Sequence, residues 1–248
     1  MATDTRKRKQ MREIERKRRQ QLYILIGIVV AAIAVLLVGI LTTQRATQTA
    51  EMVAGVAESG VYAGIERYVD ENGSYVLGDP DAPLTIADYS SFSCGHCFSF
   101  HEDQFPRLLD HVREGTVRFV YVPVAFDQYA ASATVAAYCA GEQDKFWEMH
   151  DVLFSLFSQY SINAYTRARF DEAARALDLD MEAFDACLVS SEAMSSVDNF
   201  TGLMRQLAQE YPNVTGTPTI TFNGEPPEWG SGAPQWAYFE EVISQAAG

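Results

Sequence analysis

Apolar and polar positions divide the chain into a long apolar run, a mixed α/β region and a helical region. Residues 22–41 are twenty consecutive residues without a charge. Short runs rich in β-forming residues, at 84–89 and 116–124, predict two strands with a helix over about 95–113 between them. A strand, a helix and a strand at this spacing form a βαβ unit with parallel strands.

The pattern changes downstream of the second strand. From residue 127 to about 210, apolar residues recur every three or four positions and proline is absent, which predicts helices. Strand character returns at 217–224, and a last helix is expected from Pro234 onward. We therefore expect an α/β fold in which an all-helical insertion, at about 127–210, interrupts the strands.

The uncharged run at 22–41 is long enough to cross a membrane. At about 1.5 Å per residue it spans roughly 30 Å, the thickness of the hydrocarbon core of a bilayer. A cleaved signal peptide has a shorter apolar region of about 7–15 residues, and no convincing cleavage site follows. We interpret 22–41 as a transmembrane signal anchor in contact with lipid, residues 1–21 as a basic tail and 42–74 as a membrane-proximal stalk.

The charge distribution gives the orientation. The first twenty residues contain nine Lys or Arg and three acids, whereas the other 228 contain ten and thirty, for a net charge of −14. Basic flanks stay in the cytoplasm, so residues 75–248 are expected outside it, periplasmic or at the cell surface. An acidic domain repels phosphates, which argues against nucleic acid as a partner.

Two of the four cysteines form a CxxC motif, Cys94-Gly-His-Cys97. A metal site needs about four ligands, and the only further candidate nearby is His101, so no metal is expected. A structural disulfide across so short a loop would stabilise little. The motif lies where the first strand of the βαβ unit ends and a helix begins, so backbone N–H groups favour a thiolate at Cys94. Redox catalysis is therefore the favoured interpretation.

Two further features accompany the motif. Asp88 lies six residues before Cys94 in an apolar strand, and a buried carboxylate there could accept a proton from Cys97. The alternative is an acid at an exposed edge. Far downstream, Gly216-Thr217-Pro218 opens the returning strand, and a Thr-Pro bond is a candidate for the cis form.

In combination these motifs resemble the DsbA-like thiol:disulfide oxidoreductases of the thioredoxin superfamily. The matching segments are GDPDAPLTIADYSSFSCGHC, CAGEQDKFWEMHDVLF and GTPTITFNG. The resemblance implies a thioredoxin-like fold, with Cys94 as nucleophile, Cys97 as resolving thiol and Asp88 as buried acid. It also implies that Pro218 is a cis-proline beside the active site, with Gly216 and Thr217 offering backbone to a substrate strand.

The dipeptide between the cysteines bears on the direction of electron flow. His96 could stabilise the Cys94 thiolate and so make the disulfide a better oxidant. Gly-His is the dipeptide of disulfide isomerases, whereas DsbA has Pro-His, so Gly95 departs from the family. Isomerase or reductase activity therefore stays open, as does a different class, a membrane-anchored chaperone-like binding protein.

Two cysteines and three histidines lie outside the CxxC motif. Cys139 and Cys187 are either a structural disulfide, which an oxidising compartment favours, or two buried thiols. His101, His111 and His150 are expected to be structural or exposed. The favoured function is insertion of disulfides into reduced, unfolded exported proteins, with reoxidation by a quinone-linked membrane partner. No organic cofactor is expected, because the Cys94–Cys97 pair carries the electrons.

Overall fold

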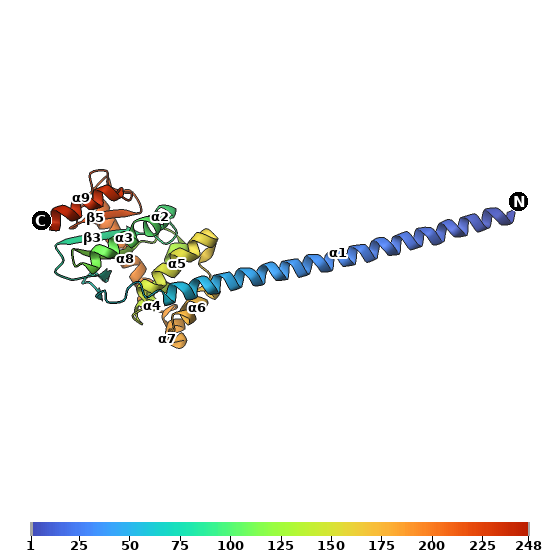
Figure 1. Cartoon of the computed structure of the whole chain (residues 1–248), viewed down its shortest axis with the longest axis horizontal. Helices are drawn as coiled ribbons and strands as arrows, with labels where there is room; N and C mark the ends of the chain where they lie inside the picture. The colour runs from blue at the N-terminus through green and yellow to red at the C-terminus, as the bar shows by residue number, and fades with distance from the viewer. Residues whose placement is uncertain (1, 248) are drawn as a thin grey trace. The chain divides into compact units, whose positions relative to one another are not determined.

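The structure is a computed structural model that describes residues 2–247 (Figure 1). The chain divides into two compact units, with the boundary after Thr49. Helix α1 (Ala2–Glu58) makes up the described part of the first unit and continues into the second. Within α1, Glu15–Ile40 contains an 18-residue stretch with a mean hydropathy of 3.0 and is the candidate membrane span among the described residues. This segment includes nearly all of the predicted anchor.

One five-stranded sheet organises the second unit, with the order β1-β2-β4-β3-β5. The strands are β1 (Arg67–Val69), β2 (Tyr75–Leu77), β3 (Leu84–Ser90), β4 (Val117–Pro123) and β5 (Thr219–Phe222). β3 and β4 are parallel, and the other neighbours are antiparallel. The parallel pair confirms the predicted βαβ unit.

Alternation along β3 places a carboxylate inside the sheet. Leu84, Ile86 and Asp88 share the buried face of this strand, and the residues between them are partly exposed. In the register of the sheet, Asp88 lies opposite Tyr121 of β4 and Ile220 of β5. β4 is buried at nearly every position, as a central strand covered on both faces requires.

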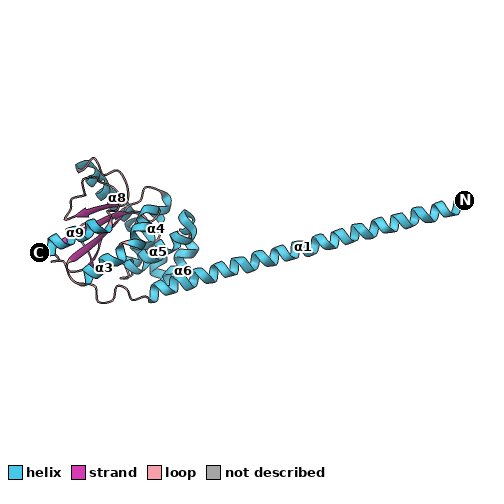
Figure 2. Cartoon of the chain, turned by 45° about the horizontal axis from the view of Figure 1, so that its top comes forward, coloured by secondary structure: helices cyan, strands magenta, loops and turns pink. Residues whose placement is uncertain are grey.

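The helices of the α/β core are α2 (Gly95–Asp103), α3 (Phe105–Arg113) and α9 (Trp236–Ala247). Figure 2 shows the strands in magenta, with α3 and α9 beside them. Phe239 of α9 stacks on Phe100 of α2, with ring centroids 6.0 Å apart, and contacts Phe222 of β5 at 5.5 Å. The C-terminal helix therefore packs against both α2 and the edge strand β5.

The predicted single helix over 95–113 is two helices. The chain breaks at Gln104, which ends α2 and precedes α3. Pro106 is the second residue of α3, and proline has no backbone N–H and clashes with the carbonyl four residues earlier. A continuous helix is therefore excluded at this point.

The segment expected to be a stalk, 42–74, is partly built into the folded unit. Val53, Tyr62 and Ile65 are buried in its hydrophobic core. β1 pairs with β2, which in turn pairs with β4. The expectation of a simple spacer is therefore wrong from about Val53 onward. The sequence did not reveal β1 and β2, because three-residue strands are too short to produce a readable alternation.

Every element between β4 and β5 is helical in the described chain. These elements are α4 (Gln128–Gly141), α5 (Phe146–Tyr160), η1 (Ser161–Ala164), α6 (Arg167–Ala176), α7 (Met181–Cys187) and α8 (Ser191–Glu210). Asp127 caps α4 by accepting hydrogen bonds from the N–H groups of Tyr129 and Ala130, both at 2.8 Å. The insertion thus begins where the sequence pattern places it. Together with the mixed sheet, the helical insertion confirms the expected thioredoxin-like fold.

A disulfide joins two helices of the insertion. Cys139 of α4 and Cys187 of α7 are bonded, and their Cα atoms are 5.6 Å apart. The sequence allows this bond or two separate thiols, and the structure contains the bond. Cys139 is fully buried, so the bond lies against the core of the insertion.

We expect the Cys139→Ser/Cys187→Ser variant to be less stable by about 4 kcal/mol, because a disulfide closing a loop of 48 residues restricts the unfolded chain. The free energy of unfolding is measured with urea on the full chain in detergent. Alkylation of a denatured Cys94→Ser/Cys97→Ser variant supplies the control and should label no thiol. Two labelled thiols per chain would contradict the bond.

Candidate active site

The two cysteines of the CxxC motif occupy different environments. Cys94 is the N-cap residue of α2 and is partly exposed, whereas Cys97 lies in the first turn and is fully buried. Both are free thiols. The Cys97 Sγ accepts a hydrogen bond from the N–H of Ser91 at 3.4 Å. Cys94 is therefore the thiol that a partner sulfur can reach.

The surroundings of Cys94 favour its thiolate. The pKa of Cys94 is lowered to about 5, chiefly by a hydrogen bond from the Cys97 side chain. The backbone N–H groups of Cys97 and His96 at the start of α2 and the side chain of Thr217 act in the same direction, against the effect of burial. Since the thiolate is the attacking species, these surroundings favour Cys94 over Cys97 as the reactive thiol.

Cys97 has the opposite tendency. Burial raises its pKa well above the ordinary value, and the neighbouring Cys94 and Asp88 raise it further. Burial likewise raises the pKa of Asp88, and the charge of Cys94 adds to this effect while Ser90 opposes it. When Cys97 releases or takes up a proton, the buried carboxyl group of Asp88, whose pKa is raised, is therefore nearby to accept or return it.

Asp88 is 2% exposed, and its Oδ1 has no hydrogen-bond partner among the described residues. The hydroxyl groups of Ser90 and Tyr121 are buried without a hydrogen bond of standard geometry among the described residues, although Ser90 lies close enough to oppose the rise in the pKa of Asp88. Native proteins leave few buried polar atoms unpaired. A carboxylate in such a position is an available proton acceptor, and it lies on the buried face expected from the sequence.

The cis-proline segment lies directly against Cys94. The Thr217–Pro218 peptide bond is cis, and the Cys94 Sγ donates a hydrogen bond to the Thr217 carbonyl at 3.3 Å. The N–H of Gly216 donates to the hydroxyl of Ser231 at 2.9 Å. The structure therefore brings Gly216, Thr217 and Pro218 to the cysteines across 123 residues of sequence.

A groove of about 330 Å³ opens beside the cysteines. It lies between α2, the cis-proline segment and the loop before α9, and His96, Ser99, Phe100, Asp103, Gln104, Thr217, Pro218, Gly232 and Ala233 line it. The N–H of Gly232 donates to the Pro218 carbonyl at 2.7 Å. His96 is exposed at the edge of this groove, next to Cys94.

The helical insertion holds the loop that precedes the motif. The hydroxyl of Tyr165 donates to the Phe92 carbonyl at 2.6 Å, and the hydroxyl of Ser93 donates to Asp127 at 2.8 Å. These anchors and Ser231 were not identified from the sequence. Serine, tyrosine and aspartate are common in loops, so no spacing signal distinguishes them.

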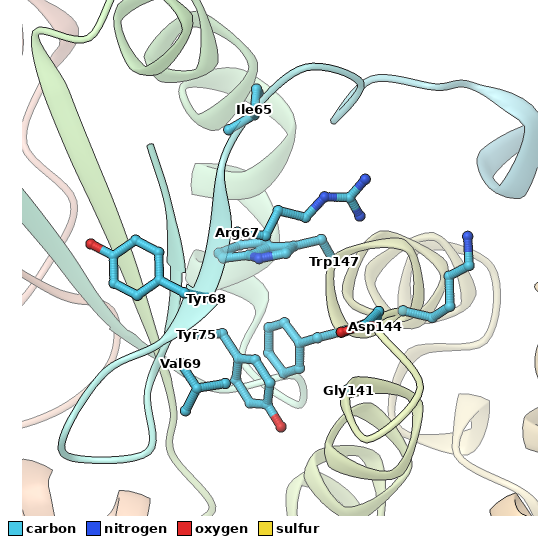
Figure 3. Close-up of a pocket in the computed structure, with 10 residues that line it drawn as sticks. Ile65, Arg67, Tyr68, Val69, Tyr75, Gly141, Asp144 and Trp147 are labelled. Carbon is cyan, nitrogen blue, oxygen red and sulfur yellow. The ribbon is translucent and has the colours of Figure 1, made fainter. Parts of the chain in front are cut away.

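A second hollow, of about 510 Å³, lies away from the motif between β1 and the α4–α5 connection (Figure 3). Arg67 and Tyr68 leave the strand on opposite sides. Trp147 lines the hollow with Tyr75, and Arg67 forms an ion pair with Glu148 at 2.9 Å. Thr217, which contacts Cys94, lines the groove beside α2 and not this hollow, so that groove is the candidate redox site.

This arrangement is suited to dithiol–disulfide exchange. An accessible thiol with a lowered pKa, a buried second thiol and a buried carboxyl group lie at the start of one helix. Together with the sheet and the cis-proline, they define a redox protein with a thioredoxin-like fold.

Comparison with known proteins supports the assignment to this class of redox protein. The family model described as thioredoxin matches residues 70–243. Disulfide bond formation protein D of Bacillus subtilis is 27% identical over 158 residues, which are 61% of this chain and 68% of that protein. The crystal structure of Wolbachia pipientis alpha-DsbA1 has a TM-score of 0.60 and 21% identity, and the match covers 72% of this chain and 92% of that one.

Two curated relatives are longer. Na(+)/H(+) antiporter NhaA 3 of Salinispora tropica is 30% identical over 205 residues, 80% of this chain but 29% of the antiporter. The chain thus spans less than a third of the length of this relative and of a second antiporter, from Salinispora arenicola. The chain belongs to the thioredoxin family, and its fold is that of DsbA proteins.

We expect the pKa of Cys94 in the reduced protein to be about 5, measured by the ultraviolet absorbance of the thiolate or by the pH dependence of alkylation. Cys97→Ala should raise this pKa, because it removes the largest stabilising hydrogen bond. Cys97→Ser keeps an O–H donor and should raise it less. A value near 8.5, that of an ordinary cysteine, would contradict the assignment.

Asp88→Asn should stabilise the reduced protein at high pH. Because the pKa of Asp88 is raised on folding, the folded protein binds more protons, and stability falls as pH rises from the ordinary value of 3.8 through the raised value. We expect the gain at pH 8 to disappear as the pH falls toward 3.8. The exposed Asp81→Asn variant is measured alongside as the control.

Proposed function

We propose that this protein is an extracytoplasmic thiol:disulfide oxidoreductase that introduces disulfides into exported proteins. The observation that carries the proposal is the contrast between the two thiols of the motif, since the pKa of Cys94 is lowered and that of Cys97 is raised. A stabilised Cys94 thiolate stabilises the reduced form, and this makes the disulfide an oxidant.

The reaction begins with the oxidised Cys94–Cys97 pair. A client thiolate attacks the Sγ of Cys94, the bond between the two cysteines breaks, and Cys97 leaves and takes up a proton. A second client thiolate then attacks the client sulfur of the mixed disulfide and releases Cys94 as a thiolate. The client loses two electrons and two protons, of which one proton stays on Cys97 and the other passes to solvent.

Other residues of the site have supporting roles in this proposal. Asp88 receives and returns the proton of Cys97. An extended client segment can add along Gly216, Thr217 and Pro218, where Thr217, whose carbonyl meets Cys94, offers its backbone and the other two residues shape the surface. His96, exposed at the edge of the groove, stabilises the Cys94 thiolate from the solvent side.

The membrane topology belongs to the same proposal. The uncharged part of the candidate span, residues 22–40, anchors the chain, with the basic tail in the cytoplasm and the redox domain outside it. A membrane partner linked to quinone would reoxidise the reduced pair. No organic cofactor is needed, since the two thiols carry the electrons. Ion transport is not proposed, because the described residues contain one candidate span.

The deciding measurement is the reduction potential of the Cys94–Cys97 pair. The full chain in detergent is equilibrated in glutathione buffers, and we expect a potential above about −180 mV together with oxidation of a reduced, unfolded client. His96→Gln should lower the potential. A potential near −270 mV would instead indicate a reductase. A Cys94→Ser/Cys97→Ser variant that keeps full function in cells would favour a binding protein.

A further inference from the structure

A polar cluster lies beneath the redox motif. His101 is on α2, one turn after Cys97, and His150 and Asp151 are on α5 of the insertion. The His101 Nε2 and the His150 Nδ1 lie 3.0 and 2.9 Å from the same Asp151 Oδ1. One potential ligand atom from each of the three residues lies within 4.8 Å of the others.

The hydrogen bonds of His101 are not balanced in this arrangement. A neutral imidazole carries one N–H, so if Nε2 donates to Asp151, Nδ1 has only a lone pair. Nδ1 is buried, has no hydrogen-bond partner in the described chain, and lies 3.4 Å from Glu102 Oε1. Two acceptors therefore face each other. A doubly protonated ring between the carboxylates of Asp151 and Glu102 would resolve this conflict, and it is the state that an absence of metal binding would indicate.

A cation bound at the Nε2 of His101 resolves the same conflict. The proton moves to Nδ1 and is donated to Glu102. A histidine that binds a metal ion through one nitrogen usually donates its other N–H to a carboxylate in this way.

We propose that His101, His150 and Asp151 bind a zinc ion. Two imidazoles and a carboxylate are a ligand set typical of Zn²⁺, whereas Ca²⁺ and Mg²⁺ prefer oxygen ligands. A tetrahedral site with bonds of about 2.1 Å separates neighbouring ligand atoms by roughly 3.4 Å, so small side-chain movements admit the ion. The hydroxyl of Tyr62, which donates to Asp151 Oδ1 at 2.7 Å, or a water molecule completes the site.

The surroundings suit a bound ion. The rings of His150 and Phe154 are edge to face with centroids 5.0 Å apart, which fixes the orientation of His150. The side chains of His101 and Asp151 are 12% and 16% exposed, so the cluster lies near the protein surface. Such a site would connect the redox helix α2 to α5 of the insertion. It departs from the expectation that His101 and His150 are structural or exposed rather than ligands.

The test measures Zn²⁺ binding by calorimetry, and Co²⁺ binding by visible absorption, on the full chain in detergent. The parent carries Cys94→Ser/Cys97→Ser, so that these thiols bind no metal, and has an affinity tag without histidine. We expect one Zn²⁺ per chain, the absorption of tetrahedral Co²⁺, and a Tm that rises with Zn²⁺ concentration. His150→Ala and Asp151→Asn should weaken binding by more than about 100-fold, and Glu102→Gln by about tenfold.

His111→Gln is the matched control. The His111 Nδ1 also lies 3.4 Å from a glutamate, Glu114, but His111 is outside the cluster, so this variant should bind normally. Circular dichroism without metal verifies that each variant folds. If His150→Ala does not fold, Glu102→Gln, which changes a more exposed side chain, still tests the proposal. No binding by the parent would overturn the proposal. Equal binding by every variant, an adventitious ion only on this acidic surface, would also overturn it.

Discussion

The parallel pairing of β3 with β4 is the constraint on which the rest of the structure depends. Its register runs from Leu84 opposite Val117 to Ser90 opposite Pro123. This pairing sets where β3 stops and therefore where α2 can begin, with Cys94 at its N-cap. The same register buries Asp88 at the centre of the sheet, beneath the motif. The reactive thiol and the buried acid are thus positioned by one set of backbone hydrogen bonds.

Electrostatics then separates two chemically identical thiols. Cys94 lies at the positive end of α2 and is partly exposed, whereas Cys97, one turn further along, is enclosed by the core. Burial costs the charged form free energy, and the hydrogen bond from Cys97 together with the helix start offsets that cost only for Cys94. In the reduced site the negative charge is therefore favoured at Cys94, whereas Cys97 and Asp88 both retain protons more readily than usual.

The helical insertion is connected to the redox site rather than only placed beside it. Tyr165 and Asp127 hold the loop before the motif, and the cluster of His101, His150 and Asp151 joins α2 to α5. Within the insertion, the Cys139–Cys187 disulfide joins α4 to α7. These contacts provide a route by which the insertion can affect the position of α2.

The sequence by itself determined the apolar N-terminal segment, the central βαβ unit, the helical insertion and the residues of the candidate redox site, because each depends on local periodicity or on a motif of fixed spacing. It did not reveal β1 and β2, which are too short to show a period, or the break that Pro106 makes in the predicted helix. Only the tertiary structure decided that His101 meets His150 and Asp151, and that Thr217 meets Cys94. Those contacts join residues 49 or more positions apart, and hydrophobic periodicity carries no information about such pairs.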